Sequence, residues 1–243
     1  MRLLTQKSEF RYSFIVFAVV FFLIAVLTIL YWLEVVTNPK LVTLISGLLT
    51  GFVIVAFQTW LSWVELIKLD EYNELKIIKI LHGRDDREYY ERLISAAEKN
   101  ISVLGVTAQR FLEHFANEQN SRVGAKVLLE ALGKGVMVKI LIASPDELTD
   151  EKDKNKANLA NPYLRQLKEK FKDNFDYAYF KHQPVHSIFT VDDESIVGPV
   201  FPGVNSEYTP AIHLRNDSKF VTNYLKYFEG EWKKWGNEKE STN

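Results

Sequence analysis

The sequence predicts an α/β protein in which two N-terminal transmembrane helices precede a soluble α/β sandwich domain. Two uncharged apolar runs, at about residues 12–33 and 41–64, are each long enough to cross a bilayer, because a helical span needs roughly 20 apolar residues. After these runs, short apolar segments of strand length alternate with segments of helical periodicity. This alternation is typical of a sheet packed against helices.

The composition excludes several classes of protein. The chain of 243 residues has room for one soluble domain beside a membrane segment. It contains no cysteine, which excludes a disulfide scaffold, thiolate catalysis and cysteine-based zinc sites. Its formal net charge of -1 gives no bulk signal for a polyanion partner, so no nucleic-acid binding is expected.

Residues 1–64 are predicted to form a transmembrane hairpin, with Asn38-Pro39 as the turn between its two spans. Backbone groups in lipid must be paired internally, so both spans should be helical. Basic residues flank the outer ends of the hairpin, whereas the connecting loop carries only Lys40. The positive-inside rule therefore predicts a two-span protein of the cell membrane with both termini and the soluble domain in the cytoplasm.

The remaining chain divides into three parts. Residues 65–83 are predicted to be a juxtamembrane helix or linker, with helix as far as about Leu81 and a break at His82-Gly83. Residues 84–236 are predicted to be the soluble domain, and residues 237–243 a polar tail.

Within the domain, apolar runs predict six strands, at 101–106, 136–142, 175–180, 186–191, 195–197 and 211–214. Helices are predicted at 86–99, 111–115 and around 123–132, with a terminal helix carrying an apolar stripe from Val221 to Trp235. The charged segment 146–158 is predicted to be a loop. A further helix should begin at Pro162 with Asn161 as its cap.

One stretch carries a chemical motif. His186 opens a short strand, Asp193 follows seven positions later in an acidic turn, and a second short strand ends at Gly198. This stretch resembles the signature of the phospholipase D superfamily, His-x-Lys-x-x-x-x-Asp, with Ile188 at the lysine position. The serine and asparagine of the family's following turn are also absent. The resemblance covers roughly residues 84–236 and indicates a single, degenerate repeat.

The resemblance implies a specific chemistry. In active members two such motifs meet, one histidine attacks phosphorus, the other protonates the leaving group, and the lysines hold the phosphoryl oxygens. His186 and Asp193 are the catalytic candidates on this basis. Ile188 supplies no cation, and loss of one preorganised electrostatic partner commonly costs about 100- to 1,000-fold in rate. A complete site would also need a homodimer or a higher oligomer. The sequence therefore favours a site that has kept binding and lost catalysis.

Polar residues near the expected strand ends are the candidates for binding a phosphate-bearing ligand. Arginines can hold phosphate through two parallel hydrogen bonds. No metal and no cofactor are expected, because the histidine spacings match no familiar site. The candidate ligand-binding residues are His186, Thr107, Arg110, Ser206, Thr209, His213 and Arg215.

Three functions are consistent with the sequence. The favoured one is a membrane-anchored cytoplasmic sensor or effector whose domain binds a phosphorylated small molecule, such as a nucleotide, and signals to the membrane helices. The second is a phosphodiesterase or phospholipase D-type transferase that works through His186 in a homodimer at the lipid bilayer. The third is a non-catalytic module for oligomerisation or docking.

Overall fold

The computed structural model describes residues 18–19, 21–33 and 38–236. The chain divides into two compact units, residues 1–71 and 72–243. In the first unit, one described helix is long and apolar enough to cross a membrane. It is the Pro39–Val64 part of helix α2 (Pro39–Leu75), with a mean hydropathy of 2.1 over its most apolar window. Asn38 caps this helix, since its Oδ1 accepts a hydrogen bond from the Lys40 amide at 3.0 Å.

The other predicted span is not established. The described part of residues 12–33 includes a shorter apolar helix, Phe21–Trp32. Residues 12–17 and 20 lie outside the described residues, as do the basic residues before them. One candidate span is therefore confirmed by length and composition, and the hairpin and its orientation stay predictions.

The structure corrects the prediction for residues 65–83. Helix α2 ends at Leu75, Lys76 has a positive φ of 49°, and Ile77–Leu81 then forms strand β1 instead of further helix. Strand β1 pairs antiparallel with β7 (Ala211–Arg215). Its β-branched isoleucines suit a strand. The backbone N–H and C=O groups of this segment form hydrogen bonds with β7, a distant partner that the local sequence pattern does not reveal. The segment is thus partly an edge strand of the sheet.

The sheet has seven strands in the order β1-β7-β6-β5-β2-β3-β4. Strands β2, β3 and β4 are parallel to one another, whereas β5, β6 and β7 form an antiparallel meander that joins β2 through β5. The six predicted strands are all present. Their bounds are β2 Asn100–Gly105, β3 Met137–Ala143, β4 Phe175–Phe180, β5 His186–Val191, β6 Glu194–Pro199 and β7.

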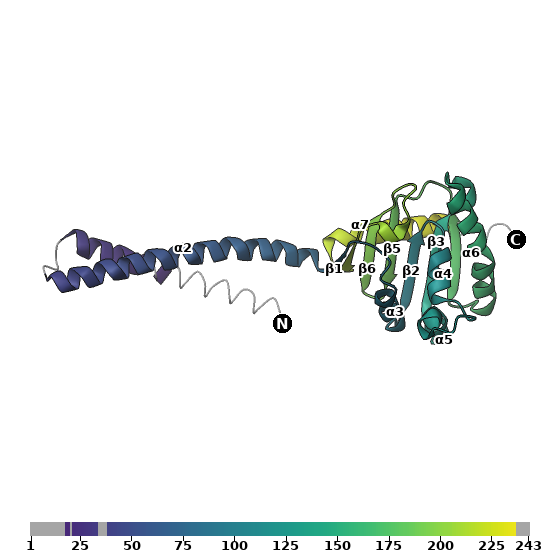
Figure 1. Ribbon diagram of the computed structural model, residues 1–243, viewed down its shortest axis with the longest axis horizontal. Coiled ribbons are helices and arrows are strands. Elements are labelled where there is room, and N and C mark those ends of the chain that lie inside the picture. The colour runs from purple at the N-terminus through teal and green to yellow at the C-terminus, as the bar shows by residue number, and fades with distance from the viewer. Residues whose placement is uncertain (1–17, 20, 34–37, 237–243) are drawn as a thin grey trace. The chain divides into compact units, whose positions relative to one another are not determined.

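Helices cover both faces of this sheet (Figure 1). One face carries Val103 and Phe189 and packs against α3 (Arg87–Ser95), α4 (Gln109–Phe115), α5 (Val127–Gly133) and much of α6 (Glu151–Lys170). The opposite face carries Leu104 and Ile188 and packs against α7 (Lys219–Trp235). Because side chains alternate along a strand, neighbours such as Ile188 and Phe189 face opposite layers. The result is the predicted mixed α/β architecture.

The prediction for the charged segment 146–158 is wrong from residue 151 onward. Helix α6 begins at Glu151, where the Asp150 carboxylate accepts the Lys152 amide at 2.7 Å. Pro162 lies inside the helix instead of at its start, and Asn161 accepts a hydrogen bond from the Tyr179 hydroxyl. An aspartate cap and ion pairs between neighbouring turns stabilise the extra helix.

Candidate functional site

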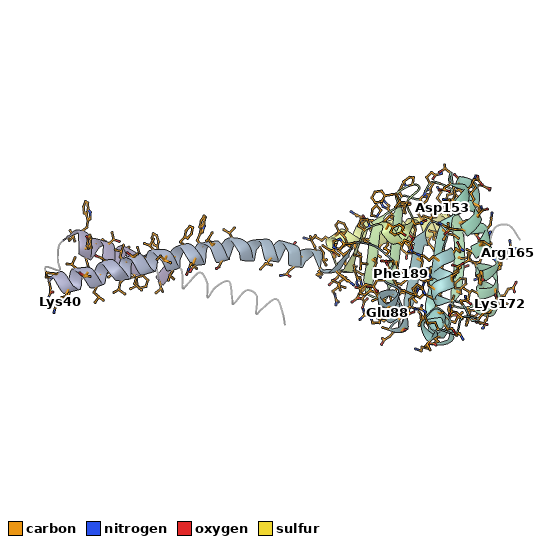
Figure 2. All side chains as sticks on the ribbon, viewed as in Figure 1. Lys40, Glu88, Asp153, Arg165, Lys172 and Phe189 are labelled. Atoms are coloured by element: carbon orange, nitrogen blue, oxygen red, sulfur yellow. The ribbon has the colours of Figure 1, made fainter. Side chains whose placement is uncertain are left out.

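A cavity of about 380 Å³ opens at the end of the sheet where β2 finishes and β5 begins. Its floor includes Val103 and Phe189 of the face that packs against α3 and α4. Its walls come from those two helices, from the loop at residues 200–209 and from the start of α6. Figure 2 labels two side chains of this lining, Phe189 on the sheet and Asp153 near the beginning of α6.

Arg84 is the most buried charged residue of the lining, with 8% of its surface exposed. Its guanidinium donates to the Pro199 carbonyl at 2.7 Å, to the Thr209 carbonyl at 3.4 Å and to the Thr209 hydroxyl. All three acceptors are neutral. Among the described residues, no carboxylate pairs with Arg84, and no acceptor is bonded to its Nη1. Burial, together with nearby Arg110, lowers the pKa of Arg84 although Tyr90 opposes the shift.

Arg110 of α4 lies beside Arg84. Its Nη2 donates to the Arg84 carbonyl oxygen at 3.1 Å and to the Ser206 hydroxyl at 3.2 Å. Its Nη1 pairs with the Glu207 carboxylate at 2.9 Å, and both side chains of that pair are about one-third exposed, at 35% and 30%. Two guanidinium groups therefore share one wall of the cavity, and one carboxylate offsets them.

A third arginine of the lining has a neutral partner. Arg87 Nη2 lies 2.8 Å from His114 Nε2. Burial, followed by the charges of Arg87, Arg110 and Arg122, lowers the pKa of His114 to about 4. The imidazole is therefore uncharged near neutral pH, accepts at Nε2, and leaves the guanidinium as a positive charge facing the cavity.

The floor beneath these cations is aromatic. Tyr90 and Phe111 each pack against Phe189, with ring centroids 5.3 and 5.9 Å apart. Burial raises the pKa of Tyr90 to about 12, so its hydroxyl stays protonated. At the α6 side of the cavity, Lys156 contacts Asp153 and Asn205, each at 3.1 Å. The cavity thus combines a cationic wall with an apolar floor, an arrangement that suits an anionic group attached to an apolar or ring-bearing body.

The structure brings four of the sequence-predicted binding residues together. Thr107 follows β2, Arg110 lies in α4, and Ser206 and Thr209 lie in the loop before β7. All four line the cavity.

His186 and Asp193 are not brought together. His186 opens β5, packs on the α7 side of the sheet with its ring 5.3 Å from Tyr224 and 5.5 Å from Tyr227, and does not line the cavity. Asp193 follows the other end of β5, and a six-residue strand separates its ends by roughly 17 Å. Ile188, at the signature lysine position, is fully buried against α7. These three positions form no joint site in this chain.

His213 and Arg215 also lie outside the cavity lining. His213 is 2% exposed, lies 2.6 Å from the Tyr89 hydroxyl and pairs with Glu194 at 3.2 Å. Burial lowers the pKa of His213, although Glu194 works to raise it. Arg215 is the last residue of β7, at the end of the strand away from the cavity, where it lies opposite Glu194 of β6. It is exposed and lies 3.6 Å from Asp217.

Sequence reasoning missed Arg84, Arg87, His114 and Glu207 as site residues. Arg84 lies beside the cavity because strand β1, which comes shortly before it in the chain, is part of the sheet. The sequence does not predict β1. From the sequence, Gly83 predicts only a break in a helix. A side chain there would place its Cβ 2.5 Å from the Glu207 carbonyl oxygen, so this glycine permits the 200–209 loop to dock. Within the described residues, no cluster of three or more suitable side chains is placed to hold a metal ion.

Comparison with known proteins identifies neither a family nor an activity. No protein-family model and no curated protein matches the chain. Among solved structures, the archaeal chromatin protein TrmBL2 is 11% identical, with a TM-score of 0.45 over 78% of this chain and 70% of its own. Phosphatidylserine synthase of Haemophilus influenzae Rd KW20 is 12% identical, with a TM-score of 0.42 over 63% of this chain. This enzyme belongs to the phospholipase D-like superfamily, and the match spans 37% of its length.

The first of these neighbours contradicts one prediction. TrmBL2 is described as showing a novel mode of DNA binding, which conflicts with the expectation that no nucleic acid is a partner. That expectation rested on the formal net charge of -1. A net charge sums over the whole chain and says nothing about how charge is distributed over any one surface. The exclusion of nucleic acid is therefore withdrawn.

Proposed function

We propose that the soluble unit binds a phosphate-bearing small molecule, with a nucleotide as the best fit, in the cavity beside Arg84 and Arg110. The observation that carries this proposal is Arg84 itself. Buried charges are normally paired with an opposite charge. Arg84 has only neutral acceptors among the described residues, and it lines a cavity open to a ligand.

Phosphate is the anion that fits this wall best. Guanidinium groups match its oxygens through paired N–H donors, and hydroxyl groups add neutral donors. Arg84 and Arg110 supply the first kind, and Ser206 supplies the second. The Thr209 hydroxyl instead donates its proton to the Ser206 carbonyl at 2.9 Å and accepts from Arg84, so it holds Arg84 in place. A cavity of about 380 Å³ with an aromatic floor has room for a ring beside the phosphate, in the range typical of small-molecule sites.

The same proposal gives the chain a sensor or effector role at a membrane. Helix α2 contains the candidate span, β1 follows it directly in the chain, and Arg84 follows β1 after a short turn. Ligand contacts at Arg84 thus act on a segment that is covalently close to the membrane helix. The proposed signal is a change in this segment when the anion binds.

The phosphodiesterase alternative has less support. His186 lies on the α7 side of the sheet, outside the cavity lining, and Ile188 beside it is fully buried. A histidine nucleophile needs the phosphoryl group within reach and a cation near its oxygens. The described residues around His186 are instead the tyrosines of α7.

The test is a calorimetric titration of the full-length chain in detergent micelles with adenosine monophosphate and with inorganic phosphate. The variants are Arg110→Met in the cavity and Arg215→Met as a matched arginine outside it. Loss of a charged hydrogen-bonding partner should weaken binding about 10- to 100-fold in Arg110→Met, with little change in Arg215→Met. Equal effects of the two substitutions, or no binding to the wild-type chain, would reject the proposed site.

A further inference from the structure

Glu207 occupies the place where a ligand's anion would meet Arg110. Its Oε2 lies 2.9 Å from Arg110 Nη1, on the cavity wall. The rest of the residue is held as well, because the Glu207 carbonyl accepts the Arg84 amide at 2.8 Å. The close approach of this carbonyl to Gly83 fixes the loop at residues 200–209 against the segment that carries Arg84.

The other carboxylates of the lining, those of Asp85, Glu113 and Asp153, differ from Glu207 in their contacts. Glu113 accepts a hydrogen bond from Gln109 Nε2 at 2.7 Å, and Asp153 pairs with Lys156. Among the described residues that line the cavity, Glu207 is the carboxylate that pairs with an arginine. It offsets one of the two adjacent guanidinium charges and leaves the charge of Arg84 without an anionic partner.

We propose that Glu207 is a built-in competitor for the ligand's anionic group, which rests on the proposed function of this cavity. In the free chain its carboxylate holds Arg110. When phosphate binds, the phosphate oxygens take this position and bridge Arg110 and Arg84, and the Glu207 side chain turns away. Glu207 therefore lowers the net affinity of the cavity for an anion, because the anion must first displace its carboxylate from Arg110. This displacement also breaks a side-chain contact that holds the loop at residues 200–209.

The pair lends itself to competition because it is only moderately strong. Both side chains are about one-third exposed, and exposed ion pairs contribute little to stability because water and salt screen them. A phosphate group that meets two guanidiniums together makes more charge-assisted hydrogen bonds than one carboxylate on one arginine. Phosphate therefore replaces the Glu207 carboxylate, but its affinity is lower than it would be if no carboxylate had to be displaced.

The experiment titrates inorganic phosphate into the full-length chain in detergent micelles and compares Glu207→Gln with Glu118→Gln. Glu118 is exposed, pairs with Lys170 and lies outside the cavity lining. Both substitutions therefore remove one carboxylate from an ion pair with almost no change in shape, but only the first removes a carboxylate of the cavity. We expect Glu207→Gln to bind phosphate about two- to fivefold more tightly than wild type, from the modest strength of exposed ion pairs, and Glu118→Gln to match wild type. Glu207→Asp, which draws the carboxylate back by one methylene, should shift affinity in the same direction and serves if the glutamine variant does not fold.

A second comparison separates competition from a structural effect. In an Arg110→Met background Glu207 has no arginine partner, so adding Glu207→Gln should not increase the phosphate affinity further. If wild type binds phosphate and Glu207→Gln binds equally or more weakly, the competitor role is wrong while the proposed function stands. If neither the wild-type chain nor any of these variants binds phosphate, the proposed function itself is wrong.

Discussion

Asp192, the residue before the aspartate of the degenerate motif, should stabilise the fold without any part in catalysis. It occupies the turn between β5 and β6 with a φ of 47°. Its carboxylate accepts three backbone amides, from Glu98 and Lys99 at 2.8 Å and from Asn100 at 2.9 Å. Partial burial works to raise the pKa of Asp192, but these hydrogen bonds outweigh it and lower that pKa.

The perturbation is Asp192→Gly, which removes the carboxylate and keeps a residue that tolerates positive φ. The three donors belong to exposed residues, so water replaces part of what is lost. We therefore expect about 2 kcal/mol of lost stability, below the sum for three buried charge-assisted bonds. For a unit of this size that corresponds to a fall in melting temperature of about 4–8 °C. Asp192→Ala should cost more, because alanine is strained at this φ.

The assay is thermal unfolding of the full-length chain, followed by near-ultraviolet circular dichroism, with Asp193→Ala as the matched control. Asp193 is exposed, so its substitution should change the unfolding free energy by no more than about 0.5 kcal/mol. The stabilisation by Asp192 should also fade in acid, since its depressed pKa means the folded state binds the proton less tightly than the unfolded chain. Equal losses in Asp192→Gly and Asp193→Ala would refute the reasoning.

Three further predictions concern other parts of the soluble unit. Ile188→Lys, which restores the family's signature residue, should destabilise the fold by roughly 3–5 kcal/mol because the position is fully buried among apolar side chains; chemical denaturation measures this, and a stable, hydrolytic variant would contradict it. Gly198→Ala should cost about 1–3 kcal/mol in the same assay, because its Cβ would meet the Pro210 carbonyl at 2.5 Å; unchanged stability would show that β7 yields easily. His114 has a pKa of about 4 in the folded chain, below its ordinary 6.5, so stability should fall as pH drops from 6.5 to 4, by about 1 kcal/mol once solvent screening is allowed for. In His114→Gln this fall should shrink, and an identical pH profile would contradict the assignment.

Much of the sheet follows from local sequence. Six strands are short apolar runs bounded by turns, and the two-residue period of their side chains assigns each residue to a face. The sequence does not predict strand β1, because the strand follows the long helix without a loop and because its partner, β7, lies more than a hundred residues away in the chain. The sequence does not predict the early start of α6, because Pro162 favours a helix start at its own position, whereas the aspartate cap at residue 150 begins the helix earlier.

The site was predictable only in part. Thr107 and Arg110 follow a strand whose carboxyl end could be placed from sequence, and both line the cavity, while their binding of a ligand stays a prediction. His186 carries the motif, yet it lies two residues before Ile188 in β5 and therefore shares the sheet face that α7 covers. Which face carries the cavity depends on the loop at residues 200–209 and on β1, and neither has a local signature. The burial of Arg84 arises from these long-range contacts.

The most direct test of the central claim is an experimentally determined structure of the full-length chain with adenosine monophosphate. The account predicts the phosphate within hydrogen-bonding distance of Arg84 and Arg110, with the Glu207 carboxylate turned away from Arg110. A phosphate bound beside His186 or Arg215, or a cavity that stays empty at saturating ligand, would contradict it.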